Sequence, residues 1–368
     1  MKIAYLSRGN SVWDRRLLEK MVERGHKPYF ISYYPGERVR VEGVENYHYD
    51  YTSMHYFPKF LSLQTALHLR KLLKSIRPDV LHTGWVIDMG FFGALCGFKP
   101  VLSMPYGSDV LLKPYESKSL KWIVRFTLRR ADMIYCDCEM VKKRITELSG
   151  CSPEKIVVFP CGIDLNVFRP LNGPSMIRKM LGWENKKVLI CTRNFDIRVH
   201  GVEYFIQAIP AILEGCPDIK VILVGSGQLE QEYRKLVSGL NLEDIVHFTG
   251  WLNEIQMAEH LNAADVYVST SLSDGTSVSM LEAMACGLPM VVTDVPSYFE
   301  WIKDGVNGYI VPRKDIEQLV KAIITLLENP GLQKEMGSRN LQIANDRADW
   351  ERNFDILEDI YKKLAAAY

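Results

Sequence analysis

The stretch that decides the fold is STSLSDGTSVSMLEAMACGLPMVVTD, residues 269–294. An apolar run ends at Ser271, and a polar loop with Asp274 and Gly275 follows. A helix is predicted from Ser277, and a second apolar run covers 288–294. Strand, loop, helix and strand in this order form a βαβ unit, in which the two strands run parallel. The stretch therefore predicts a parallel sheet with polar loops at its strand ends.

The same alternation continues in both directions. We expect a first series of strands at 2–7, 27–33, 79–84, 100–107, 133–137 and 156–160, with helices at 12–24, 61–76, 117–131 and 139–149. A second series has strands at 188–193, 219–225, 245–250, 265–271, 288–294 and 308–312, with helices at 201–213, 228–240, 254–263, 277–286 and 315–328. This rhythm predicts the α/β class, with two Rossmann-like, doubly wound parallel-sheet domains that face each other across a cleft.

The domain boundaries follow from the turn formers in NVFRPLNGP, residues 166–174. We expect a first domain at 1–168 and a second at 175–345. The last amphipathic stretch, 349–368, has no obvious place in the second sheet. We therefore predict that this helix packs back on the first domain and completes it.

Composition excludes several classes of protein. The 368 residues are 47% hydrophobic and 24% charged, unlike a disordered chain. The net charge of +1 argues against a nucleic-acid binder, although 1–170 carries +9 and the remainder −8. No apolar run reaches the ~18 residues of a membrane span. The first residues turn polar too early for a signal peptide. The eight cysteines form no CxxC pair, so we expect a reduced, cytoplasmic protein.

The loop and helix within 269–294 form a candidate anion site. Ser277, Val278 and Ser279 lie where the backbone amides of a helix N-terminus lack partners inside the helix. Asp274 precedes that helix and Glu282 lies in it, so both carboxylates can line one cleft while the amides hold a phosphate. The more ordinary interpretation is a capping acid and a solvated helical glutamate.

This stretch resembles the donor-site signature of retaining glycosyltransferases of the GT-B fold, glycosyltransferase family four. The second acid of that signature is matched by Glu282, and its small-residue run by Ala283 through Pro289. The first acid, usually a glutamate, is Asp274 here. The resemblance implies that Glu282 holds the ribose hydroxyls of a nucleotide and that Asp274 contacts the sugar. It also implies that the first domain binds the acceptor and the second the donor.

Cations for the donor diphosphate are implied by the same resemblance. Arg193 follows the strand 188–193 where the family has a phosphate-binding arginine, and arginine suits that task because it is permanently charged. The family lysine that follows is absent, because His200 stands before Gly201. Either His200 or Arg198 is therefore expected to replace it.

Other segments match the family less closely. Gly225 and Gly227, in VGSGQ, form either a phosphate-binding turn or, more simply, a tight strand-to-helix turn. FTGWL (248–252), with Trp251 and Leu252, resembles the loop that reads the nucleobase, and 295–312 resembles the usual continuation of the signature.

Two segments of the first half also carry family positions. In PYGSDV, 105–110, Asp109 is kept, whereas Tyr106 replaces the family histidine. Near the N-terminus the family has paired glycines that bind the donor diphosphate closely, and here they are reduced to Gly9, between Arg8 and Asn10.

No metal site and no resident cofactor are expected. Asp137-Cys138-Glu139 superficially resembles a ligand pair for a divalent ion, but Asp137 more simply caps the helix at 139–149. The resemblance implies that arginines and helix dipoles neutralise the diphosphate. The nucleotide-diphosphate sugar is then a co-substrate, linked to uridine or guanosine.

The basic stretch 119–132 favours an anionic partner. Lys121, Arg125, Arg129 and Arg130 share a predicted helix with Trp122. Such a helix either lies peripherally on an anionic membrane, at its inner face, or packs on the core with a solvated basic face. The same field would favour an anionic acceptor, whether a glycan, a lipid-linked compound or a small hydroxyl compound.

Three functions remain open from the sequence. The first is a hexosyl-type glycosyltransferase that moves a sugar from a nucleotide-diphosphate donor to an acceptor hydroxyl with retention of configuration. The second is a nucleotide-sugar epimerase of the same shape, which would isomerise the sugar without an acceptor. The third is a nucleotide-sugar-binding module that has lost catalysis, an alternative that the changes at 106, 200 and 274 keep open.

Overall fold

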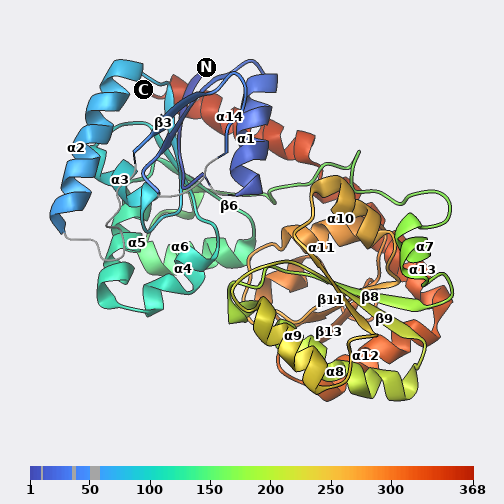
Figure 1. Cartoon of the computed structure of the whole chain (residues 1–368). Helices are drawn as coiled ribbons and strands as arrows, with labels where there is room; N and C mark the ends of the chain where they lie inside the picture. The colour runs from blue at the N-terminus through green and yellow to red at the C-terminus, as the bar shows by residue number, and fades with distance from the viewer. Residues whose placement is uncertain (10, 35–38, 50–58) are drawn as a thin grey trace. The chain divides into compact units, whose positions relative to one another are not determined.

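The computed structural model describes residues 1–9, 11–34, 39–49 and 59–368, with only the backbone of Val12 and of 59–62. Asn10, which lies in the N-terminal loop discussed above, falls outside the described residues. The chain divides into two compact units, one of residues 1–159 with 354–368 and the other of residues 160–353 (Figure 1).

The first unit is a seven-stranded sheet in the order β3-β2-β1-β4-β5-β6-β7, in which all neighbours are parallel. Its strands are β1 (Lys2–Leu6), β2 (Lys27–Ser32), β3 (Glu45–His48), β4 (Val80–Gly84), β5 (Val101–Met104), β6 (Met133–Cys136) and β7 (Ile156–Val158). Its helices are α1 (Val12–Glu23), α2 (Lys59–Ile76), α3 (Met89–Cys96), α4 (Ser108–Leu111), α5 (Lys118–Arg130), α6 (Glu139–Ser149) and α14 (Trp350–Ala366), with the 3-10 turns η1 (Lys113–Tyr115) and η2 (Pro153–Lys155).

The second unit is a six-stranded parallel sheet in the order β10-β9-β8-β11-β12-β13. Its strands are β8 (Lys187–Thr192), β9 (Ile219–Val224), β10 (Val246–Gly250), β11 (Val266–Ser269), β12 (Met290–Thr293) and β13 (Tyr309–Val311). Its helices are α7 (Met176–Leu181), α8 (Val202–Gly215), α9 (Glu230–Gly239), α10 (Glu254–Leu261), α11 (Val278–Ala285), α12 (Ile316–Glu328) and α13 (Pro330–Arg347), with the 3-10 turns η3 (Arg198–His200) and η4 (Pro296–Glu300).

Side chains alternate between the two faces of the second sheet. Along β9, Val221 and Leu223 belong to one apolar cluster, whereas Ile222 and Val224 belong to another. A strand that is apolar on both sides is typical of a parallel sheet covered by helices on both faces. The doubly wound class predicted from the sequence is thereby confirmed.

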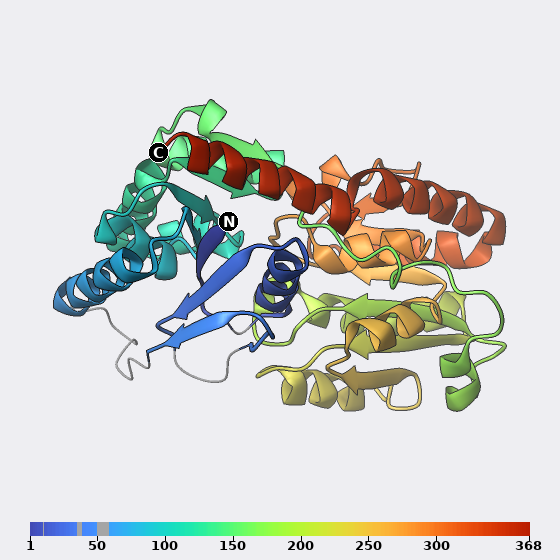
Figure 2. The ribbon, with the colours of Figure 1, turned by 90° about the horizontal axis from the view of Figure 1, so that it is seen from above.

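The C-terminal helix α14 lies along the first unit (Figure 2). Glu358 accepts a 2.9 Å contact from the His26 ring, and Tyr361 OH lies 2.7 Å from His82 Nδ1 at β4. Tyr361 is fully buried. These contacts attach the end of the chain to the first sheet, with the division between the units at Asn353 and Phe354.

Predicted and observed elements differ by at most three residues at an end, but β3, α3, α4, α7 and α13 were not predicted from the sequence. Seven of the eight residues of α3 are buried, so it lacks the amphipathic period. Helix α13 is mostly polar and buries only Met336, Gly337, Asn340 and Ala344. Helix α6 begins at Glu139, as expected, but the prediction that Asp137 caps it is wrong, because Cys138 occupies the N-cap.

Across the described ranges, no helix has both the length and the apolar composition of a membrane span. All eight cysteines are free thiols, and all but Cys161 are buried. Strand β11, helix α11 and strand β12 form the βαβ unit that the 269–294 stretch predicts, and the two strands pair in parallel.

Candidate functional site

The candidate site lies where the strand order of the second sheet reverses. Strands β8 and β11 are neighbours there, although β9 and β10 separate them in the chain. Arg193 directly follows β8, Ser269 ends β11, and Asp274 lies in the loop after β11. Loops at such a reversal diverge to the two faces of the sheet, and the crevice between them is where open α/β sheets bind ligands.

The guanidinium of Arg193 is held by three side chains. Its Nη1 lies 3.0 Å from Asp274 Oδ2, and its Nη2 donates to Ser269 Oγ at 2.8 Å and to Tyr298 OH at 2.5 Å. Tyr298 OH in turn donates to Asp274 Oδ2 at 3.0 Å. The four side chains form a closed hydrogen-bonded group, which fixes the orientation of the arginine.

This group is almost completely buried. The Arg193 side chain is 7% exposed and that of Asp274 21%. Burial by itself lowers the pKa of Arg193, but Tyr298, Tyr267 and Asp274 more than compensate and raise it above its ordinary value. Arg193 is thus a permanent positive charge, and no described residue bonds its buried Nε.

Tyr298 is the site residue that sequence reasoning missed. It lies in η4 and is fully buried, and burial raises its pKa above the ordinary value. The neighbouring Ser297 Oγ donates to the carbonyls of Asp274 and Gly275, at 3.1 and 2.9 Å, so η4 also anchors the Asp274 loop. The only sequence signal was its place in 295–312, directly after the motif.

The start of α11 is close to the predicted one. Ser277 is the N-cap, and its Oγ accepts from the Met280 amide at 3.3 Å. Ser279 Oγ lies 3.1 Å from both Ser277 Oγ and Tyr267 OH. Val278 is half-buried beside them. The serine hydroxyls are therefore engaged with the protein, and the backbone amides of the first turn are what the helix offers an anion.

Glu282 lies inside α11 and is 8% exposed. The ordinary interpretation of Glu282 is a solvated glutamate on a helix. That interpretation does not fit, because the residue is buried. A buried carboxylate in the second turn of the helix is a suitable acceptor for hydroxyl groups.

Arg198 and His200 have different surroundings. Arg198 is 60% exposed and forms a two-point pair with Glu232, at 2.8 and 2.6 Å. Burial, followed by the charge of Arg193, lowers the pKa of His200 to about 3. His200 is therefore neutral at pH 7, and its buried Nδ1 has no partner in the part of the chain that the structure describes. Neither residue is a free cation here.

Gly225 and Gly227 make close backbone packing possible. A Cβ at Gly225 would lie 1.9 Å from the Arg193 carbonyl oxygen, and one at Gly227 would lie 2.5 Å from the Phe195 carbonyl carbon. Both have φ near +150°. The tight-turn interpretation accounts for both glycines, because the turn packs directly on the loop after β8.

Trp251 and Leu252 follow β10, at the carboxyl edge of the same sheet. Trp251 is 66% exposed, and Leu252 packs partly on the core. An exposed indole in this position can stack on a flat ring.

The first-unit candidates follow β1 and β5, the first of them at the corresponding reversal between β1 and β4 and the second one strand further along the sheet. Asp109 is fully buried and accepts from the amides of Val86 and Tyr106, both at 2.9 Å. Burial raises its pKa to about 6. Asp109 therefore fixes the loops after β4 and β5.

The loop after β1 carries Gly9, which is buried with φ of 78°. The preceding Arg8 pairs with Asp88 at 2.6 Å and lies 3.8 Å above the Trp85 ring. Trp85 stacks on Tyr106 with centroids 4.7 Å apart. This edge of the first sheet thus presents a cation and an aromatic pair, neither of which the sequence predicted.

The described residues contain no cluster of three or more His, Cys, Asp or Glu that could hold a metal ion. The second unit offers a fixed positive charge at Arg193 and backbone amides at the start of α11.

Two family models match the chain. "Glycosyltransferase Family 4" matches residues 13–167, and "Glycosyl transferases group 1" matches residues 186–329. The chain belongs to the GT-B glycosyltransferases. The two models fall one on each described unit, and the second spans Arg193, Asp274 and Glu282.

Similar proteins include other glycosyltransferases. An Escherichia coli enzyme, UDP-Gal:alpha-D-GlcNAc-diphosphoundecaprenol alpha-1,3-galactosyltransferase, is 26% identical over 82% of this chain and 78% of its own. N-acetyl-alpha-D-glucosaminyl L-malate synthase of Bacillus anthracis is 25% identical over 96% and 93%.

Solved structures share the fold of this glycosyltransferase. Sucrose-phosphate synthase from Thermosynechococcus elongatus has a TM-score of 0.84 at 20% identity, over all of both chains. HepE from Anabaena, solved with UDP, has a TM-score of 0.80 at 20% identity, over 98% of this chain and 100% of its own. The GT-B architecture predicted from the sequence is confirmed.

Proposed function

We propose that this glycosyltransferase transfers a hexosyl group from a nucleotide-diphosphate sugar to an acceptor hydroxyl, with retention of configuration. The observation that carries the proposal is the fixed charge of Arg193 at the strand reversal, in the same unit as the N-terminus of α11. Oriented backbone donors and a buried cation are what stabilise a departing diphosphate.

Each candidate site residue of the second unit then has a role in binding the donor. The amides of Ser277, Val278 and Ser279 hold diphosphate oxygens, and Arg193 supplies positive charge. Glu282 accepts hydroxyl groups of the ribose, while Asp274 faces the sugar and keeps Arg193 oriented. Trp251 and Leu252 contact the nucleobase.

The reaction exchanges one C–O bond for another. The bond from the anomeric carbon to the diphosphate oxygen breaks, and the acceptor oxygen bonds to that carbon on the same face. The acceptor proton passes to the departing diphosphate. The protein needs no nucleophile for this route, and the buried charge of Arg193 stabilises the developing negative charge.

The acceptor is assigned to the first unit, near the loops that Asp109 fixes. Among the similar proteins, one is named for a diphosphoundecaprenol acceptor and another for a phosphatidylinositol mannoside. A lipid-linked or glycan acceptor is therefore the first class to test. A UDP-linked donor is likewise the first choice, because the E. coli enzyme is named for UDP-Gal and HepE was solved with UDP-glucose.

The experiment has two steps. Thermal unfolding with UDP, GDP and their sugars identifies the base, because a ligand that binds only the folded state raises the midpoint. Donor consumption is then followed with and without acceptors, and the anomeric configuration of the product is read by NMR. An isomerised sugar formed without acceptor would show an epimerase, and binding without turnover would show an inactive module.

The variant that tests the site is Glu282→Gln. Its matched control is Glu328→Gln, at the exposed end of α12. We expect the first to lose donor binding and transfer, and the second to keep both. Equal activity in the two variants would contradict the ribose assignment.

A further inference from the structure

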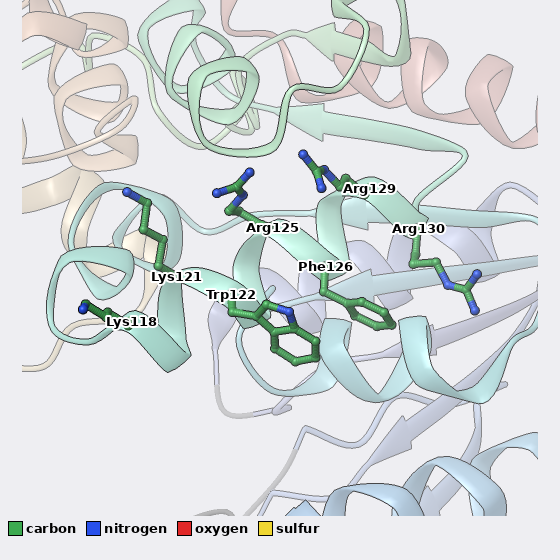
Figure 3. Close-up of a pocket in the computed structure, with 7 residues that line it drawn as sticks. All are labelled: Lys118, Lys121, Trp122, Arg125, Phe126, Arg129 and Arg130. Carbon is green, nitrogen blue, oxygen red and sulfur yellow. The ribbon is translucent and has the colours of Figure 1, made fainter.

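Helix α5 carries an unusually cationic exposed face. This face, called here the basic face of α5, consists of Lys118, Lys121, Trp122, Arg125, Arg129 and Arg130, all exposed. Phe126 lies half-buried between them. Figure 3 shows the cationic side chains extending around the rings of Trp122 and Phe126. Five positive charges thus surround one aromatic pair along a single helix.

The five charges are not neutralised within the described part of the chain. No carboxylate pairs with any of them, and Arg129 donates only to the Ser149 carbonyl, at 2.6 Å. Two basic residues of neighbouring elements are paired by contrast, Lys113 with Glu116 and Arg144 with Glu147. The basic face of α5 therefore keeps its positive field, which is free to attract an anionic surface.

The aromatic residues distinguish a membrane from a soluble polyanion. Trp122 is 56% exposed and stacks on Phe126 with centroids 5.3 Å apart. A tryptophan that stays exposed among cations is typical of side chains that sit at lipid headgroup level. The opposite side of α5, with Val124 and Leu128, is buried in the core, so the helix cannot insert.

We propose that the basic face of α5 docks peripherally on a membrane surface rich in anionic phospholipids. Lys121, Arg125 and their neighbours bind the headgroup phosphates, and Trp122 enters the interface between them. The docking needs no change in the fold, because the side chains involved are already exposed. It is a function of the first unit separate from sugar transfer, and it would place the enzyme at a lipid surface.

The test is binding of the full chain to vesicles. Phosphatidylcholine vesicles with about 30 mol% phosphatidylglycerol are compared with phosphatidylcholine alone, since each basic residue near an anionic surface adds roughly a fivefold factor to binding. We expect binding to the anionic vesicles only. Raising the salt from about 0.1 M to about 0.5 M should release the protein, because the screening length shortens.

The decisive variant is Lys121→Glu/Arg125→Glu, which we expect to weaken vesicle binding by about tenfold or more. The matched control is Lys179→Glu/Lys235→Glu, which makes the same change in net charge on exposed lysines of the second unit. Trp122→Ala should weaken binding less and leave the salt dependence in place. Unfolding midpoints and donor turnover of both double variants serve as fold controls.

Either of two results would overturn the proposal. One is equal binding to vesicles with and without phosphatidylglycerol. The other is an equal loss in the α5 variant and in the control, which would mean that only net charge matters. Binding of polyphosphate or RNA without any binding to anionic vesicles would likewise reject a membrane as the partner.

Discussion

Arg193 Nη1 and Asp274 Oδ2 lie 3.0 Å apart, and Tyr298 OH bonds both side chains. The family resemblance implies that Arg193 meets the donor phosphate and Asp274 the sugar. In the structure the two residues form an ion pair with each other. The orientation of the arginine therefore depends on the acid, and the two positions should behave as one unit in mutagenesis.

Replacing Arg193 by methionine should abolish transfer and also destabilise the second unit. The resemblance implies that this change removes a phosphate contact and hence activity. The structure adds a penalty of up to about 3 kcal/mol, because Asp274 loses the partner of a mostly buried ion pair. We expect Arg193→Met/Asp274→Asn to regain stability but not activity, as measured by denaturant unfolding and initial rates. A double variant no more stable than Arg193→Met would contradict the coupling.

Removing only the hydroxyl of Tyr298 tests its positioning role. Tyr298→Phe keeps the ring but removes two hydrogen bonds, the one from Arg193 Nη2 to the hydroxyl and the one from the hydroxyl to Asp274 Oδ2. We expect kcat to fall about tenfold to a hundredfold with little change in KM, and stability to fall by about 1 kcal/mol. Tyr309→Phe, on β13, is the control for loss of a tyrosine hydroxyl. An unchanged kcat in Tyr298→Phe would mean that Asp274 and Ser269 orient the arginine without it.

Arg198 and His200 were both expected to replace the missing family lysine. Arg198 is paired with Glu232 on the surface, and such exposed pairs contribute little to stability. We therefore expect Arg198→Ala to lower kcat less than tenfold, and Arg193→Ala to lower it far more. A loss in Arg198→Ala as large as that in Arg193→Ala would establish Arg198 as the second cation, with Glu232 releasing it on donor binding.

The glycine turn after β9 should tolerate no side chain. Gly225→Ala and Gly227→Ala each force a Cβ into the backbone of the loop after β8 and demand a φ that alanine rarely adopts. We expect a lower unfolding midpoint and loss of activity in both. Gly239→Ala is the matched control, because nothing lies within 4 Å of its Cβ position, and it should be neutral or stabilising by about 0.5 kcal/mol. Equal midpoints in all three would refute this packing.

The contact of His82 with Tyr361 predicts a pH dependence of stability. Burial lowers the pKa of His82 to about 3, whereas in the unfolded chain it titrates near 6.5. Between these values the unfolded state binds the extra proton, so the free energy of unfolding falls as the pH drops from 6.5 toward 3. The full contribution is present above pH 6.5. The slope approaches about 1.4 kcal/mol per pH unit.

His82→Gln removes this titration while keeping an oxygen that can accept from Tyr361. We expect the wild type to be the more stable protein at pH 7.5 and to lose its advantage as the pH falls toward 5. Asp109, whose pKa burial raises to about 6, titrates in the opposite sense, but it does so in both proteins and cancels in the difference. Parallel stability curves for the two proteins would contradict the prediction.

Much of the fold could be predicted because the apolar runs and turn residues carry local information. The 269–294 stretch alone specifies a strand, a polar loop, a capped helix and a second strand. The missed elements lack that information: α3 is buried on all sides, and α13 is mostly polar, so neither has a clear period. The N-cap of α6 was predicted one residue too early, at Asp137, because N-cap positions depend on backbone angles.

The sequence by itself determined the class of sheet, the start of α11 near Ser277 and the positions of Arg193, Asp274 and Glu282 along the chain. Only the tertiary structure decided which of these are partners. Arg193 meets Asp274, Tyr298 and Ser269 because parallel strands bring their carboxyl ends to one edge, where residues about 75 to 105 positions apart come within hydrogen-bonding distance. Burial, which sets the charge of His200, is likewise a property of the packed chain and cannot be read from its neighbours in sequence.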